Sequence, residues 1–210
     1  PLADAYIDPF SGRADLAARV LRVVDPETFV DDSLRVLRGA QLVARYEFIV
    51  DPATEALCQR IALDDLPAER IWAEFEKLLI VARRPSLGLE ALRRFGALDR
   101  LFPELSALIG VEQEPDWHPE GDVWTHTLMV VDEAREAIDG LDRAARTTVM
   151  LAALCHDLGK PATTRRVDGR VRSLGHDHAG LEPTERLLDT LNTRHPRTGH
   201  RDGERLPHRN

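Results

Sequence analysis

Two histidines and an aspartate in the second half of the chain are of the residue types that hold metal ions. His126 lies in an amphipathic segment, and His156-Asp157 closes the apolar segment that follows it. Imidazole and carboxylate groups are ordinary ligands of divalent transition metals, and a bound metal lowers the pKa of water toward about 7. Lys160, just beyond the pair, can neutralise a phosphate. These residues predict metal-assisted hydrolysis.

A purely structural role is the alternative for each of these residues. A single histidine on an apolar face, such as His126, is more often a hydrogen-bonded core residue than a ligand. The adjacent His156-Asp157 pair is harder to explain in this way, because burying both groups is costly unless they are paired or bind metal. A carboxylate at the carboxyl end of a helix also opposes the helix dipole, so capping explains Asp157 poorly.

Asp32, Arg35 and Arg38 form a polar group at the start of a segment that predicts a helix over residues 31–46. Asp32 and Arg35 lie three residues apart and share one helical face. A carboxylate acceptor beside a guanidinium donor can pair with the edge of a nucleobase. A helix cap with an ion pair inside the helix is the alternative, and the spacing alone favours that alternative.

Arg70, Glu74 and Lys77 form a third polar group. They are spaced four and then three residues apart, on one face of a segment that predicts a helix over residues 68–81. Considered alone, this spacing favours a solvated stripe of ion pairs.

Taken in order, these groups resemble motifs of the bacterial tRNA nucleotidyltransferase (CCA-adding) and poly(A) polymerase family. Residues 7–16 are similar to the family's motif that joins its head to its neck, and residues 29–38 look like its nucleotide-base recognition helix. Asp31 stands where the family usually has Glu. The Arg70 group is similar to a later neck motif, so the resemblance covers about residues 7–100.

The resemblance implies that Asp32 and Arg35 select the incoming nucleotide by pairing with its base, with Arg38, Arg70 and Glu74 in the same nucleotide-binding site. It implies ATP and CTP as substrates and a tRNA or other RNA 3′ end as the partner. The family's phosphate-binding element and the two carboxylates that hold Mg²⁺ for nucleotidyl transfer belong to the head, which these 210 residues lack. The chain alone is therefore expected not to polymerise.

The second half resembles the HD phosphohydrolase superfamily, through His126 and the His-Asp-Leu-Gly-Lys run at residues 156–160. Residues 117–128 and 175–180 also look like the HD domain of bacterial nucleotidyltransferases. HD domains usually complete the metal site with an aspartate on a later helix. Asp189 is not a convincing substitute for that aspartate, so the fourth ligand stays open.

By this resemblance, His126, His156 and Asp157 are metal ligands, and Lys160 is catalytic. His176 and His178 line the pocket or bind a second metal, and the alternative is that they are surface residues of their loop. The implied cofactor is a divalent metal, with Ni, Co, Mn or Mg as candidates. The implied substrates are phosphomonoesters or cyclic phosphodiesters.

The elements that must position these groups are almost all helices. Apolar periodicity, caps and breakers predict an all-α fold with a small β-hairpin at residues 163–174. The resemblance implies that this fold is the helical neck and body of a class II nucleotidyltransferase, followed by a helical HD domain. The predicted helices span residues 15–24, 31–46, 51–62, 68–81, 87–95, 98–101, 123–138, 143–158 and 181–191.

A stretch rich in Pro, Gly and acids, residues 103–121, predicts the junction between two helical parts. We expect residues 1–14 to be a remnant of the head-to-neck junction and residues 15–102 to form the RNA- and nucleotide-binding neck. Residues 103–191 then form an HD domain, expected to be incomplete, and residues 192–210 form a disordered tail.

Composition restricts the partners and the compartment. The net charge of −8 argues against a protein-wide basic field for nucleic acid but allows local arginine stripes. The two cysteines lie in apolar patterns, which makes a disulfide framework unexpected. No apolar run reaches the roughly 20 residues needed to span a bilayer. We therefore expect a cytoplasmic protein with no membrane partner.

Three functions remain open at this point. The leading hypothesis is an RNA 3′-end nucleotidyltransferase of the CCA-adding or poly(A) polymerase type, represented by its neck and HD regions. The second is a free-standing HD-type metal-dependent phosphohydrolase. The third is a non-catalytic RNA-docking module that uses Arg83-Arg84 and Arg93-Arg94. These motifs do not distinguish the addition of CC, A, CCA or poly(A).

Overall fold

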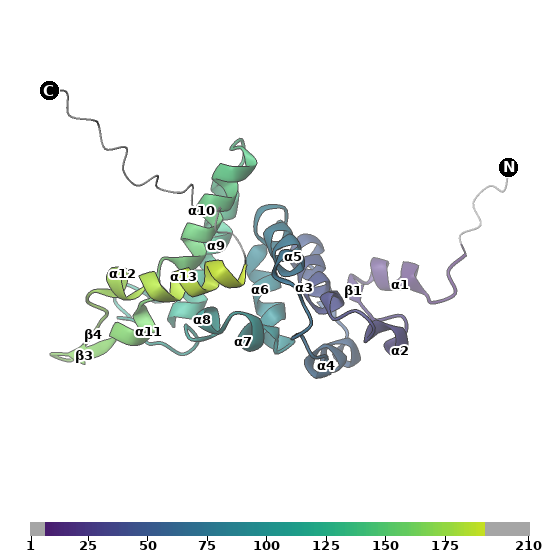
Figure 1. The fold of residues 1–210 in the computed structure, drawn as a ribbon, viewed down its shortest axis with the longest axis horizontal. Helices are drawn as coiled ribbons and strands as arrows, with labels where there is room; N and C mark the ends of the chain where they lie inside the picture. Colours follow the sequence, from purple (N-terminus) through teal and green to yellow (C-terminus); the bar gives the residue numbers. More distant parts are fainter. Residues whose placement is uncertain (1–6, 192–210) are drawn as a thin grey trace, which may run out of the picture.

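The computed structural model describes residues 7–191, and helices dominate this part of the chain (Figure 1). The predicted all-α class, with a small hairpin in the second half, is confirmed. The elements of the first half are α1 (Gly12–Ala17), β1 (Val20–Leu21), α2 (Pro26–Phe29), α3 (Leu34–Tyr46), β2 (Ile49–Val50), α4 (Pro52–Arg60), α5 (Ala68–Ile80), α6 (Pro85–Arg94), α7 (Ala97–Leu101) and α8 (Pro103–Ser106). The elements of the second half are α9 (Val123–Ala137), α10 (Arg143–Cys155), α11 (Lys160–Thr163), β3 (Arg165–Val167), β4 (Arg170–Arg172), α12 (His176–Ala179) and α13 (Leu181–Thr190).

The predicted helix over residues 15–24 is wrong. α1 ends at Ala17, Arg19 takes a left-handed conformation with φ of 55°, and β1 follows. β1 pairs in parallel with β2, which the sequence pattern did not predict. Leu16 and Val24 are 64% and 59% exposed. Within residues 7–191 these two side chains stay mostly uncovered, so a continued helix would gain little burial from them, whereas pairing with β2 satisfies the backbone.

Two predicted helices are shorter than expected. α3 begins late, at Leu34, and α10 ends early, at Cys155, so the His-Asp pair lies in the turn after α10. The predicted hairpin is confirmed. Asp168 and Gly169 at its tip have φ of 51° and 76°, the left-handed pair that a two-residue turn requires.

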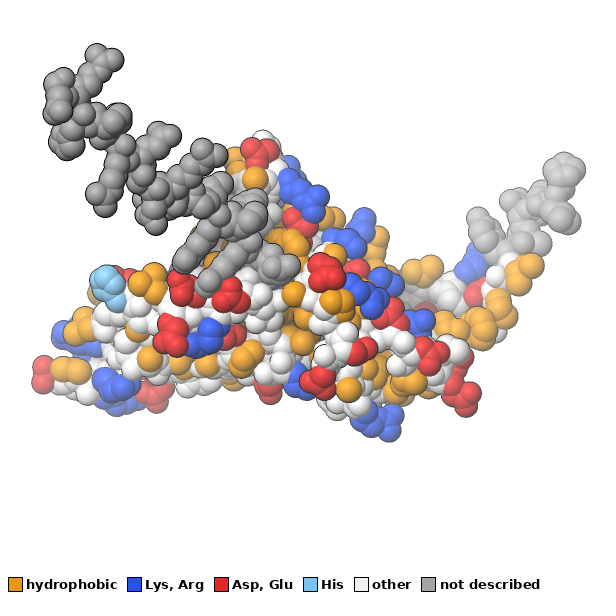
Figure 2. Space-filling model, viewed as in Figure 1, with side chains coloured by type: hydrophobic (Ala, Val, Ile, Leu, Met, Phe, Trp, Pro, Cys, Tyr) orange, Lys and Arg blue, Asp and Glu red, His pale blue; other side chains and the backbone are white. Residues whose placement is uncertain are grey.

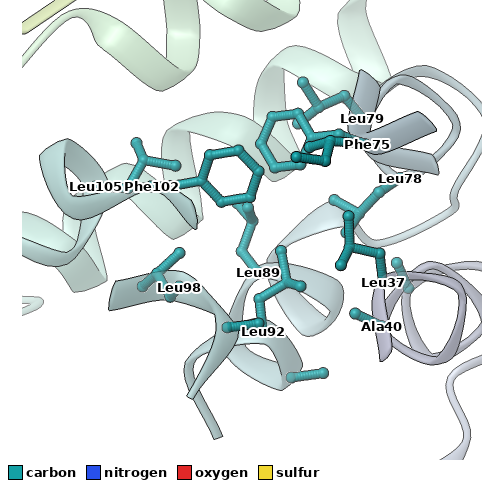
Figure 3. Packing of buried hydrophobic residues seen from close by; sticks show 14 of the residues in the cluster. Leu37, Ala40, Phe75, Leu78, Leu79, Leu89, Leu92, Leu98, Phe102 and Leu105 are labelled. Atoms are coloured by element: carbon teal, nitrogen blue, oxygen red, sulfur yellow. The ribbon is translucent and has the colours of Figure 1, made fainter. Parts of the chain in front are cut away.

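The core of the first half lies where α3, α5 and α6 pack together (Figure 3). Leu37 of α3, Phe75 of α5 and Leu89 of α6 are all buried. The ring centroid of Phe75 lies 4.6 Å from that of Phe102. Gly88 permits the close approach of α6 to α3, because a Cβ at this position would lie 2.9 Å from a backbone carbonyl oxygen of α3.

The second half packs directly on the first. α9 lies against α6 and α10 against α5, and buried residues of both halves form one hydrophobic cluster. Glu76 of α5 is buried and pairs with Arg143 of α10. Asp132 of α9 accepts hydrogen bonds from the backbone and the hydroxyl of Ser86 at 2.9 and 2.6 Å. The helices of the first half therefore support those that carry the metal-site candidates.

Acidic and basic side chains are interspersed on the face shown in Figure 2, in keeping with the net charge of −8. No helix within residues 7–191 combines the length and the apolarity that crossing a membrane requires. Cys58 and Cys155 are free thiols, and burial raises their pKa to about 11 and about 12 respectively.

Candidate metal centre and nucleotide site

The side chains predicted as metal ligands come together around Asp157. His126 lies in the first turn of α9, and His156 and Asp157 lie in the turn after α10. Each of the three offers a ligand atom, and these atoms lie within 4.8 Å of one another. Asp122 caps α9 by accepting the backbone N–H of Thr125, which fixes the turn that carries His126.

Four nitrogen atoms surround the carboxylate of Asp157, whose side chain is 3% exposed. Nε2 of His156 lies 3.0 Å from Oδ2, and Nε2 of His126 lies 3.9 Å from the same atom. Nε2 of His176 lies 3.7 Å from Oδ1, and Nζ of Lys160 lies 2.8 Å from Oδ2. Ligands of one ion lie roughly 3 to 4 Å apart when each bond is about 2.1 Å. The imidazole spacings therefore fit a divalent cation.

The Oδ2 atom of Asp157 is buried, and none of its neighbours reaches it with hydrogen-bond geometry. The short approach of Lys160 is therefore an ion pair, and that of His156 becomes one when the imidazole is protonated. Burial acts to raise the pKa of Asp157, but these two groups outweigh it and lower the pKa to about 2. Asp157 in turn raises the pKa of His156, against the effect of burial. A buried carboxylate oxygen without an aligned hydrogen bond, facing imidazoles, can take a metal cation as a further partner beside Lys160.

Two of the surrounding histidines are oriented by backbone carbonyls. Nδ1 of His156 lies 2.8 Å from the carbonyl oxygen of Ala153, and Nδ1 of His176 lies 2.8 Å from that of Ser173. A carbonyl oxygen only accepts, so Nδ1 carries a hydrogen in both rings, and in the neutral imidazole the lone pair of Nε2 faces Asp157. Metal-binding histidines are commonly held in this way.

Lys160 is buried, and its ammonium group donates to Oε1 of Gln113 at 2.7 Å. It therefore contacts Asp157 and Gln113 directly. The preceding Gly159 allows α12 to pack against this turn, because a Cβ there would lie 1.9 Å from the carbonyl oxygen of His176. This close packing brings His176 to the centre.

A cavity of about 300 Å³ adjoins the centre. Lys160 and His176 line one part of it, and His118, Trp117 and Arg172 line another. The cationic and imidazole groups suit a small molecule that carries phosphate, and Glu114 adds one carboxylate to the lining.

The polar groups of the first half also come together, between α3 and α5. Arg70 donates to both carboxylate oxygens of Asp32, at 3.0 and 3.2 Å. Glu74, which is buried, lies 3.4 Å from Arg38 and 3.2 Å from Lys77. The polar group around Asp32 and the polar group around Arg70 are therefore paired with one another across α3 and α5.

Arg35 does not form the ion pair with Asp32 that its spacing suggests. Its guanidinium group donates to the carbonyl oxygen of Thr28, whereas the ion pair of Asp32 is with Arg70. Burial acts to raise the pKa of Asp32, but the N–H of Leu34 and the charge of Arg70 outweigh it and lower the pKa, with a smaller contribution from Arg35. A cavity of about 280 Å³ lies beside these residues, and Arg35 helps to line it.

The arginine pairs considered as RNA contacts are engaged with acids. The four pairings are Arg83 with Glu47, Arg84 with Asp132, Arg93 with Glu90, and Arg94 with Glu55. This local neutralisation weakens the case for these particular arginines as phosphate contacts.

Two residues of the centre were not predicted from the sequence. Gln113 and Glu120 lie in the stretch before α9 that was interpreted as a junction, and no periodicity marks them. The one signal for Glu120 was its place in the run of residues 117–128 that resembles HD domains. The expected position of a fourth ligand, in the aperiodic tail of residues 192–210, lies outside the described residues.

Comparison with known proteins agrees with both halves of this description. Residues 47–109 match the family model described as "Probable RNA and SrmB- binding site of polymerase A", and residues 123–195 match the HD domain model. The multifunctional CCA protein of Ralstonia nicotianae is 47% identical over 195 residues, which make up 90% of this chain and 43% of that protein. The multifunctional CCA protein of Laribacter hongkongensis is 44% identical over 190 residues, which make up 88% of this chain and 44% of that protein.

Solved structures are more distant. A tRNA nucleotidyltransferase complexed with a primer tRNA and an incoming ATP analog is 20% identical, with a TM-score of 0.42, over 89% of this chain and 64% of that one. The present chain spans less than half the length of the curated relatives above. It is a homologue of the multifunctional CCA proteins and contains a poly(A)-polymerase RNA-binding region followed by an HD domain.

Proposed function

We propose that the second half of the chain is a metal-dependent phosphohydrolase centre in which His126, His156 and Asp157 hold a divalent cation. The convergence of these side chains on a buried carboxylate oxygen that lacks a hydrogen bond is the main support. The match to the HD domain model adds to it. When bound, a divalent ion supplies Lewis acidity toward phosphate and water.

The other residues of the centre bind and orient the substrate. Lys160 and His176 line the cavity, where the positive charge of Lys160 favours an anionic phosphate group. The imidazole-rich ligand set favours Ni or Co, with Mn and Mg also candidates. The substrates we expect are phosphomonoesters or cyclic phosphodiesters.

The test uses the purified chain loaded with Ni²⁺ and bis(p-nitrophenyl) phosphate as a generic phosphodiester. His156→Ala and Asp157→Asn are each expected to lower the rate by about 100-fold or more, since each removes a ligand. His178→Ala is the matched control, because the His178 side chain is 88% exposed. Hydrolysis by His156→Ala at the rate of the unmodified chain would contradict the assignment.

We further propose that the first half selects the nucleotide for a parent protein that adds nucleotides to the 3′ end of tRNA. Asp32 and Arg35 would pair with the base of ATP or CTP, with Arg38, Arg70 and Glu74 holding the site. The fixed carboxylate of Asp32 and the similarity to multifunctional CCA proteins support this role. Mg²⁺ would serve the transfer step in the parent protein, which we expect in the cytoplasm.

The test compares the incorporation of ATP and CTP into tRNA by the full-length protein. Asp32→Ala is expected to disturb the choice between the two nucleotides, because one half of the base-pairing edge is lost. Glu27→Ala, which removes an exposed carboxylate on α2, is the control. Unchanged selectivity in Asp32→Ala would exclude the base-reading role.

A further inference from the structure

Glu120 contacts two imidazoles at once, at the edge of the metal centre. Its Oε1 atom lies 2.7 Å from Nδ1 of His126 and 2.9 Å from Nδ1 of His118. The two rings meet nearly edge to face, with centroids 4.8 Å apart. The carboxylate is 15% exposed, less than either imidazole, so the rings and the surrounding loop shield it from water.

The contact with His126 completes a pattern around Asp157. His156 and His176 each donate from Nδ1 to a backbone carbonyl, and each turns Nε2 toward Asp157. His126 also turns Nε2 toward Asp157, but the partner of its Nδ1 is the side chain of Glu120. A carboxylate that accepts from Nδ1–H fixes the ring orientation and makes Nε2 a stronger electron donor than a carbonyl partner does.

We propose that Glu120 is a positioning residue of the metal centre, which selects the Nδ1–H tautomer of His126 so that the lone pair of Nε2 faces the cation position beside Asp157. This inference rests on the proposed phosphohydrolase centre. His126 faces Asp157 with Nε2 and Glu120 with Nδ1, so we assign the separations of 2.7 and 2.9 Å to hydrogen bonds that position the ring rather than to a second ion held by His118, Glu120 and His126.

The test measures the tautomer and the metal affinity separately, on the whole chain. Nitrogen NMR of the metal-free chain reports which nitrogen of His126 carries the hydrogen, and calorimetry with Ni²⁺ alone gives affinity and stoichiometry. Glu120→Ala is expected to shift His126 toward the Nε2–H tautomer and to weaken Ni²⁺ binding by about 10- to 100-fold. Glu120→Gln, which keeps an oxygen acceptor, is expected to retain part of the tautomer preference of His126 and part of the Ni²⁺ affinity.

Glu112→Gln is the matched control, because Glu112 lies in the same stretch and pairs with Arg166 on β3. It is expected to leave tautomer and affinity unchanged. Circular dichroism checks folding, and if Glu120→Ala unfolds, Glu120→Gln carries the comparison.

An unchanged tautomer and an affinity within twofold of the parent chain would overturn the inference. A parent chain that binds two Ni²⁺ ions, one of which is lost in Glu120→Ala, would also overturn it, since Glu120 would then be a ligand. A chain that binds Ni²⁺ but hydrolyses no phosphate ester would refute the proposed activity. The effect of Glu120→Ala on the tautomer and on Ni²⁺ affinity could still be interpreted. A chain that binds no Ni²⁺ would refute both.

Discussion

Arg70 of α5 donates to both carboxylate oxygens of Asp32, at 3.0 and 3.2 Å. The side chains of Asp32 and Arg70 are 30% and 45% exposed, so the pair contributes little to stability. Its consequence is orientation, because the carboxylate that we propose as a base-reading acceptor is held from a second helix.

Removing Arg70 should therefore change nucleotide choice more than folding. In the full-length protein, Arg70→Ala is expected to alter the ratio of ATP to CTP incorporation while changing the free energy of unfolding by about 1 kcal/mol or less. Arg70→Lys should rescue the ratio at least in part, since both hydrogen bonds come from the single nitrogen Nη2 and an ammonium group can also donate to a carboxylate. Arg60→Ala, an exposed arginine on α4, is the control. An unchanged ratio in Arg70→Ala would show that Asp32 needs no such support.

The stability of the metal-free chain should carry an acid-dependent contribution from Asp157. The folded-state pKa of this group is lowered from 3.8 to about 2, so its stabilisation is present above 3.8 and is lost as the pH falls toward 2. In EDTA, the difference in unfolding free energy between the parent chain and Asp157→Asn should shrink across that window. Denaturant titrations at several pH values measure it, and a difference independent of pH would contradict the pKa shift.

Metal removal should lower thermal stability, because an ion that binds only the folded chain stabilises it. At a free Ni²⁺ concentration of about 100 times the dissociation constant, the gain is about 2.7 kcal/mol. Calorimetric melting with Ni²⁺ and with EDTA is expected to show a higher Tm with the metal. In His156→Ala the two melting curves should nearly coincide, and an equal metal-dependent gain in that variant would place the ion elsewhere.

Gly88 should tolerate no side chain. In Gly88→Ala the new Cβ would lie 2.7 Å from the Cβ of Ala44, and we expect a loss of about 1–3 kcal/mol from overpacking. Gly39→Ala on the facing helix is the control. Its Cβ would lie 3.6 Å from Phe95, an ordinary contact, so helix propensity should make it neutral or stabilising by about 0.5–1 kcal/mol. Denaturant unfolding separates the two, and equal stabilities would contradict the close packing of α3 and α6.

Local sequence patterns predicted the elements that are determined by residues close together in the chain. The helix over residues 68–81 appears as α5, and Asp51 caps α4 as expected. The Asp168-Gly169 turn also follows from residue type. These features depend on neighbours in the chain, which periodicity and turn chemistry detect.

Features that depend on distant partners were not predicted. The β1–β2 pair needs residues 20–21 and 49–50 side by side, and neither segment alone indicates a strand pairing. The contact of Asp32 with Arg70 crosses two helices, and Glu120 reaches His126 from a loop without periodicity. The family resemblance brought the right groups to attention, but only the packed structure tells which atoms meet.

The shared hydrophobic cluster, with an ion pair between the buried Glu76 and the exposed Arg143 beside it, has a consequence for dissecting the chain. A recombinant fragment cut at the boundary between the two family matches would strip α9 and α10 of the helices that cover them. It would also remove the ion pair between Glu76 and Arg143. The two regions thus match different family models but are expected to melt as one cooperative unit.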